Sequence, residues 1–110
     1  MSDMTLRSLQ RYIRDKDFHP DLKLQYLQKL VEEVGELAKA MRKDVRYAQI
    51  QNIKGTLEEE LYDVLYYIIA LSNVYDVDLE SVMRLKEPVN SAKYGQVEHF
   101  DTEHLGGRQS

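Results

Sequence analysis

The segment from Leu57 to Val74 constrains the fold of this chain more than any other, because its apolar side chains surround almost the whole circumference of a helix. A helix that is apolar on most sides must pack against neighbours on more than one side. The stripe and the two side chains that widen it are Leu57, Leu61, Val64, Leu65, Ile68, Leu71 and Val74, with Tyr67 and Ile69. In a chain of 110 residues, this pattern predicts an all-α fold, a bundle of four to five helices whose core is completed by homo-oligomerisation.

Amphipathic spacing predicts two helices before this segment. Residues 4–16 form a short helix, and residues 20–43 form a long one. Pro20 is expected in the first turn of the long helix, where its missing N–H is not needed. Residues 44–55 show only weak periodicity and are expected to form a loop with at most one helical turn.

Capping residues predict where the later helices begin. Thr56 and Glu59 have the spacing of a capping box at the start of the apolar helix. Asp78 has the character of an N-cap for a further helix. Pro88 is expected to kink or restart that helix, because proline breaks an interior hydrogen bond, so that residues 89–94 resume as a short helix.

The composition favours one domain over residues 1–95, followed by a polar tail over residues 96–110. No apolar run approaches the roughly 18 residues that a membrane span needs, so no membrane partner is expected. The net charge of −4 offers no basic face for polymeric nucleic acid. The chain has no cysteine, and residues 1–5 lack a charged-then-apolar leader pattern, so a cytoplasmic location is expected.

Two acidic pairs lie within the apolar helices, Glu33 with Glu36 and Glu60 with Asp63. A carboxylate against an apolar helix surface is costly unless it is paired. Residues three apart project from neighbouring turns, so the four carboxylates face one point if the two helices pack side by side. Glu60 is the most informative of them, because it falls inside the apolar stripe between Leu57 and Val64.

Four converging carboxylates repel one another, and this predicts a hard divalent cation between them. Ligand sets made only of oxygen suit Mg²⁺, Mn²⁺ or Ca²⁺, and Mg²⁺ is the working prediction, with Mn²⁺ as a substitute. A di-iron bundle site would need a Glu-x-x-His on each of two helices. Here the third residue after Glu33 is Glu36 and the third after Glu60 is Asp63, so a di-iron centre is disfavoured.

Three stretches together resemble the MazG-like nucleotide pyrophosphohydrolases, which belong to the all-α NTP pyrophosphatase superfamily. They are residues 29–38 (KLVEEVGELA), residues 59–65 (EELYDVL) and the element Lys86…Asn90-Ser91-Ala92-Lys93-Tyr94. The resemblance covers roughly residues 20–95, and it is specific as a set. Two positions depart from the family pattern: Glu87-Pro88 interrupts the last element, and Gly95 stands where family members often have proline.

The resemblance implies Mg²⁺-dependent hydrolysis of nucleoside triphosphates between the α and β phosphates, which gives a monophosphate and pyrophosphate. The expected substrates are dNTPs or non-standard NTPs, and the expected role is to clear them. By position, the family's metal ligands are Glu33, Glu36, Glu60 and Asp63, its extra catalytic acid is Glu32 or Glu59, and its phosphate- and nucleotide-binding residues are Lys86, Asn90, Lys93 and Tyr94. The family forms dimers or tetramers, so a homodimer or homotetramer is expected.

Two alternatives stay open on the sequence. A phosphoribosyl-ATP pyrophosphohydrolase would share the acid pattern. A non-catalytic helical dimer that binds a nucleotide or a protein would tolerate the loss of Glu60 or Asp63.

Overall fold

The structure, a computed structural model, describes residues 3–94, with side chains as far as Pro88. Within this range it contains five helices and no strand, which confirms the all-α prediction. The helices are α1 (Leu6–Lys16), α2 (Lys23–Lys43), α3 (Tyr47–Ile50), α4 (Leu57–Val74) and α5 (Leu79–Tyr94). Not one helix in this part of the chain is long and apolar enough to cross a membrane. The predicted boundary at residue 95 and the predicted tail lie outside the described residues.

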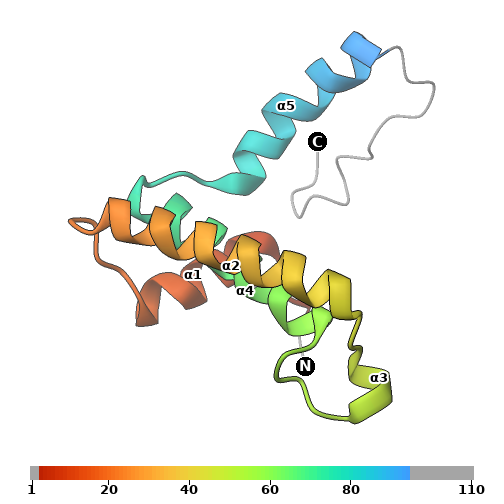
Figure 1. The fold of residues 1–110 in the computed structure, drawn as a ribbon. Coiled ribbons are helices and arrows are strands. Elements are labelled where there is room, and N and C mark those ends of the chain that lie inside the picture. Colours follow the sequence, from red (N-terminus) through yellow and green to blue (C-terminus); the bar gives the residue numbers. More distant parts are fainter. Residues whose placement is uncertain (1–2, 95–110) are drawn as a thin grey trace.

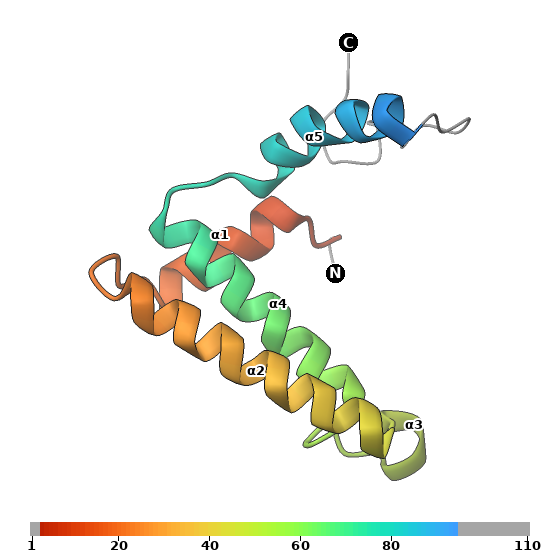
Figure 2. The ribbon, with the colours of Figure 1, turned by 45° about the horizontal axis from the view of Figure 1, so that its top comes forward.

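Helices α2 and α4 lie side by side and antiparallel along most of their length (Figures 1 and 2). The loop that contains α3 joins them at one end, and α1 packs across α4 at the other. Helix α5 contacts α1 and projects away from the α2–α4 pair (Figures 1 and 2). The α2–α4 pair is therefore the rigid frame on which the two acidic pairs are carried.

The buried core lies where α1 crosses α4. It contains Leu9 and Ile13 from α1, Tyr26 from α2, and Ile69, Ala70 and Val74 from α4. By contrast, many large apolar side chains of the α2–α4 pair remain exposed, among them Leu24, Leu27, Val31, Val34 and Met41 on α2 and Leu61, Leu65 and Ile68 on α4. The apolar surface of the predicted bundle is thus only partly covered within one copy of the chain.

Two local predictions about helix starts need correction. Helix α2 begins at Lys23, so Pro20 precedes it, in a turn closed by the N–H of Leu22, which donates to the carbonyl of His19 (2.9 Å). At the start of α4, the N–H of Glu59 donates to Thr56 Oγ1 (3.2 Å), as a capping box requires. The Glu59 carboxylate, however, accepts from the N–H of Gly55 (2.7 Å), so the box is only half formed.

The predicted restart of the last helix at Pro88 is wrong, because α5 is one helix from Leu79 to Tyr94. Proline removes one hydrogen bond from a helix interior, and the bonds on either side can keep the helix continuous. Because the backbone is continuous, positions 86, 90 and 93 follow steps of four and three along one side of α5.

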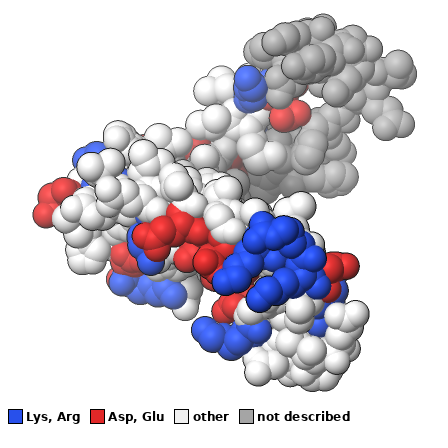
Figure 3. Space-filling view, viewed as in Figure 1, with Lys and Arg blue, Asp and Glu red and all other residues white. Residues whose placement is uncertain are grey.

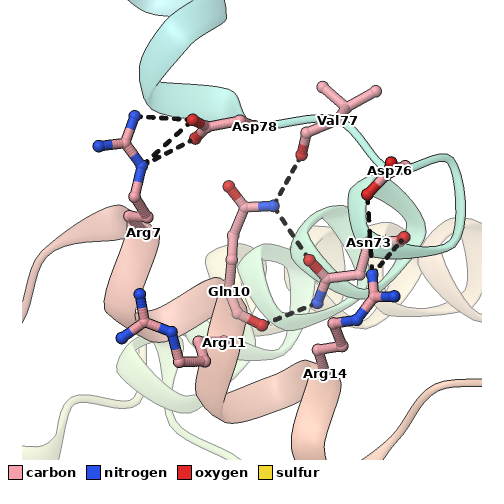
Figure 4. A pocket seen from close by; sticks show the side chains of 8 residues that line it. All are labelled: Arg7, Gln10, Arg11, Arg14, Asn73, Asp76, Val77 and Asp78. Atoms are coloured by element: carbon pink, nitrogen blue, oxygen red, sulfur yellow. Dashed lines mark hydrogen bonds and ion pairs between the residues drawn. The ribbon is translucent and has the colours of Figure 1, made fainter.

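Polar contacts hold the start of α5 against α1 (Figure 4). Arg7 Nη2 donates to Asp78 Oδ2 at 2.7 Å, and the backbone N–H of Arg7 donates to the buried carboxylate of Glu80 at 2.7 Å. Gln10 and Asn73 form a buried amide pair, in which Gln10 Nε2 donates to Asn73 Oδ1 at 3.0 Å. These contacts fix the direction in which α5 leaves the bundle.

Asp17 links the first loop to both long helices. Its two carboxylate oxygens accept from the hydroxyls of Tyr26 on α2 (2.7 Å) and Tyr66 on α4 (2.6 Å). Burial raises the pKa of this carboxyl, but the hydrogen bonds from Tyr66 and Tyr26 outweigh that effect and lower the pKa below its ordinary value. The charged form of Asp17 is therefore the one that the fold prefers.

We expect Asp17→Asn to lower the free energy of unfolding by about 1.5–3 kcal/mol at pH 7, because hydrogen bonds to a charged group contribute that much. A carboxyl whose pKa is lower in the folded state stabilises the fold above its unfolded pKa, and this contribution is lost as the pH falls through the folded value. The variant should therefore lose less stability than the wild type between pH 5 and pH 2. Urea denaturation across that range measures both effects, and Asp15→Asn, at an exposed position, should behave as wild type.

Candidate active site

Three of the four predicted metal ligands meet on the facing sides of α2 and α4. Glu33 comes from α2, and Glu60 and Asp63 come from successive turns of α4. One carboxylate oxygen of each lies within 4.8 Å of the other two. We call these three residues the acid cluster. Figure 3 shows acidic side chains gathered over the middle of the α2–α4 pair, with basic side chains beside them.

Glu60 is the buried member of the acid cluster, with 9% of its surface exposed. Its Oε1 is buried and has no hydrogen-bond partner among the described residues. Burial, followed by the charges of Asp63 and Glu33, raises the pKa of Glu60 to about 7. A buried carboxylate oxygen is costly when no donor satisfies it, and none of the described residues donates to Glu60 Oε1.

Asp63 is half-buried, and burial followed by the charge of Glu59 raises the pKa of its carboxyl. Glu59 is held at the start of α4 by its hydrogen bond from Gly55 and by Lys54, whose Nζ lies 3.7 Å from Glu59 Oε2. Of the two predicted catalytic acids, Glu59 is thus positioned within electrostatic range of the cluster.

The remaining predicted acids lie outside the acid cluster. Glu36 is exposed on α2, one turn after Glu33, and its carboxylate is not among the three that meet. Glu32 is also exposed and pairs with Lys29, whose Nζ lies 3.4 Å from Glu32 Oε1. Glu36 follows Glu33 by three residues and therefore borders the same face of α2.

The predicted substrate-binding residues all belong to α5. Lys86 is exposed, and the side chains of Asn90, Lys93 and Tyr94 lie outside the described part of the structure. Because α5 projects away from the α2–α4 pair (Figure 2), this element does not approach the acid cluster of its own chain.

Sequence reasoning missed a cavity beside the acid cluster. It has a volume of about 210 Å³ and is lined by Asp17, His19, Leu22, Gln25, Tyr26, Lys29 and Tyr67. Lys29 precedes Glu33 by one turn of α2, and Tyr67 follows Asp63 by one turn of α4. The same spacing that identified the acids could therefore have identified these two residues.

A larger cavity, of about 350 Å³, lies at the joint of α1, α4 and α5 (Figure 4). Two of its three arginines are engaged in the fold: Arg7 binds Asp78, and Arg14 Nη1 reaches the carbonyl of Asn73 (3.4 Å) at the end of α4. Cations at a helix carboxyl end satisfy its free carbonyls. This cavity is remote from the acid cluster, and its polar groups serve to fix α5.

The family model of the MazG nucleotide pyrophosphohydrolase domain matches residues 23–87, which span the acid cluster and the start of α5. Two crystal structures of iMazG from Vibrio DAT 722 are 44% identical to this chain. For Ctag-iMazG the TM-score is 0.74, and the match covers 80% of this chain and 99% of the iMazG chain. For Ntag-iMazG the TM-score is 0.76, and the match covers 84% of this chain and 100% of the iMazG chain. The uncharacterized protein YpjD of Bacillus subtilis (strain 168) is 34% identical in an alignment of 89 positions, and the match covers 73% of this chain and 78% of that protein.

The site is thus an all-α frame in which α2 and α4 bring three carboxylates together on their facing sides. The chain belongs to the MazG nucleotide pyrophosphohydrolase family, whose members are hydrolases that act on nucleotide phosphoanhydride bonds.

Proposed function

We propose that this protein hydrolyses nucleoside triphosphates between the α and β phosphates in a Mg²⁺-dependent reaction. Water adds across the phosphoanhydride bond, and the products are a nucleoside monophosphate and pyrophosphate. The substrates that we favour are dNTPs or non-standard NTPs, which the enzyme would clear. The observation that supports this most is the buried oxygen of Glu60 in the acid cluster, which has no hydrogen-bond partner among the described residues, in a chain of this family.

The acid cluster fits a divalent cation. Its ligands are all oxygens, as Mg²⁺ and Mn²⁺ prefer, and the shared space lies between carboxylates that otherwise raise the pKa of Glu60. Glu33, Glu60 and Asp63 would hold the ion, and Glu36 would join them after a rotamer change. A bound Mg²⁺ neutralises phosphate oxygens and lowers the pKa of a water molecule.

The other side chains have roles that follow from their positions. Glu59 is the preferred acceptor for the proton of the attacking water, because it lies beside Asp63 and is oriented by Gly55 and Lys54. Glu32 is the second candidate; it is exposed and pairs with Lys29. Cationic side chains of α5 would stabilise charge on the pyrophosphate group as it leaves.

We further propose that the active protein is a homodimer or homotetramer. The exposed apolar side chains of α2 and α4 form a surface that a single copy leaves uncovered, and Val31 alone is 62% exposed. A second copy packed on this surface would complete the bundle. It would also place an α5 with Lys86, Asn90, Lys93 and Tyr94 near an acid cluster that the chain's own α5 does not approach.

Pyrophosphate release tests the proposed function. The purified chain should be incubated with each NTP, each dNTP, several non-standard NTPs and phosphoribosyl-ATP, with Mg²⁺, with Mn²⁺ and with chelator. We expect pyrophosphate and monophosphate from at least one triphosphate, only with the divalent ion present. Turnover of phosphoribosyl-ATP alone would overturn the proposed substrate class, and no turnover under any ion would overturn the enzyme function.

A further inference from the structure

Lys29 and Tyr67 form a cation–aromatic pair one turn away from the acid cluster. On α2, Lys29 and Glu33 are four residues apart, and on α4, Asp63 and Tyr67 are four residues apart. Because α2 and α4 are antiparallel, the step from Glu33 to Lys29 and the step from Asp63 to Tyr67 lead in the same direction along the seam, the line where the two helices face each other. Lys29 Nζ lies 6.0 Å from the centre of the Tyr67 ring, so the two side chains meet across the seam.

The cavity of about 210 Å³ begins at this pair. Its walls combine the ring surfaces of Tyr26 and Tyr67 with the amide of Gln25, which can both donate and accept hydrogen bonds. Along the seam the order is therefore carboxylates, one ammonium group, and a small cavity with aromatic walls. A nucleotide that presents its polyphosphate to the carboxylates has the matching order: β and γ phosphates, α-phosphate, nucleoside.

We propose that Lys29 is a substrate-binding residue that contacts the α-phosphate of the nucleotide and directs the nucleoside end toward the cavity. This inference rests on the proposed function, and it adds a phosphate contact from the same chain that supplies the acid cluster. It differs from the contacts expected from α5, which would meet the phosphates of the leaving pyrophosphate.

The ammonium of Lys29 is available for this contact. Its ion pair with Glu32 is 3.4 Å long, and the two side chains are 47% and 63% exposed. Exposed pairs of this kind contribute little to stability, so the ammonium can exchange a glutamate for a phosphate oxygen at small cost. No rearrangement of α2 or α4 is required, because the flexible side chain of lysine alone has to move.

The two reaction products separate this inference from general electrostatic attraction. The monophosphate retains the α-phosphate, whereas pyrophosphate does not. We expect Lys29→Met to weaken the binding of deoxynucleoside monophosphates about tenfold, the loss of one charge-assisted hydrogen bond, and to leave pyrophosphate affinity unchanged. Titrations followed by NMR, with each monophosphate in turn and then with pyrophosphate, measure both affinities for the folded chain.

Two further variants complete the experiment. Lys29→Arg keeps the charge and should retain most of the monophosphate affinity, and Lys39→Met removes an exposed lysine of the same helix and should bind as wild type. Equal monophosphate affinity in Lys29→Met and wild type would overturn the inference, as would an equal loss for both products. A wild-type chain that binds no monophosphate would also overturn it. Failure to turn over triphosphates bears on the proposed function alone, because these affinities are measured without turnover.

Discussion

Glu60→Gln should abolish pyrophosphate release, with a fall of at least a hundredfold, and should raise the thermal midpoint of the metal-free protein. The first effect follows because the proposed metal site would lose its buried ligand. The second follows because Gln removes a buried carboxylate that lies beside Glu33 and Asp63 and whose Oε1 has no donor in the described part of the chain. Removing such a charge stabilises the fold by about 1 kcal/mol, or roughly 4–8 °C in a domain of this size.

Mg²⁺ distinguishes this explanation from a purely structural role for Glu60. Addition of Mg²⁺ should raise the thermal midpoint of the wild type, because an ion that binds only the folded state stabilises it. The same addition should leave Glu60→Gln unchanged. Glu58→Gln is a suitable control, since Glu58 lies on the same helix but pairs with Arg46 outside the cluster (3.3 Å), and it should keep the response to Mg²⁺. A Mg²⁺ response in Glu60→Gln equal to that of wild type would contradict the proposed site.

Two inactive variants should restore activity to each other when they share one oligomer. The first is Glu60→Gln, which lacks a functional acid cluster, and the second combines Lys86→Met with Lys93→Met, which removes the cations of α5. If α5 of one copy serves the acid cluster of another, a mixed dimer contains one intact site. Random pairing makes half of the dimers mixed, so co-expression should recover roughly a quarter of wild-type activity.

The control for this complementation is a pair of variants with defects on the same side of the site. Glu60→Gln and Asp63→Asn, when co-expressed, should recover no activity, because no acid cluster in the mixture is complete. Sedimentation of the mixed sample verifies that the subunits associate. Associated but inactive mixtures of the first pair would mean that α5 does not complete the site of another copy, and a monomeric wild type would refute the proposed oligomer.

The period of the helix explains how much the sequence alone could predict. Because residues three and four apart share a helix face, the sequence predicted that Glu33, Glu60 and Asp63 would meet. The structure places these three carboxylates together. The same rule predicted α4 almost to the residue and indicated that its apolar surface exceeds what one copy covers. Glu36 satisfies the same spacing yet lies outside the cluster, because a helical face is broad and spacing does not select a rotamer.

Local rules failed at three positions, Pro20, Glu59 and Pro88. Pro20 was placed in the first turn of α2, but the turn closed by His19 and Leu22 precedes the helix. The carboxylate of Glu59 was expected at the N–H of Thr56, but it accepts from Gly55 instead. Pro88 was expected to kink or restart the last helix, and the restart is wrong because α5 continues through Pro88: a missing hydrogen bond weakens a helix without ending it.

By itself, the sequence determined the approximate positions of the helices, which faces are apolar, and that carboxylates lie on those faces, because each of these properties depends on neighbours within a few turns. Only the tertiary structure decided that Asp17 joins Tyr26 to Tyr66, that Lys29 lies across from Tyr67, and that α5 leaves the bundle. These depend on the antiparallel register of α2 and α4 and on the contacts of Arg7 and Gln10 with residues more than sixty positions away. Helix direction and register are set by such distant packing, and the local period of a sequence does not contain them.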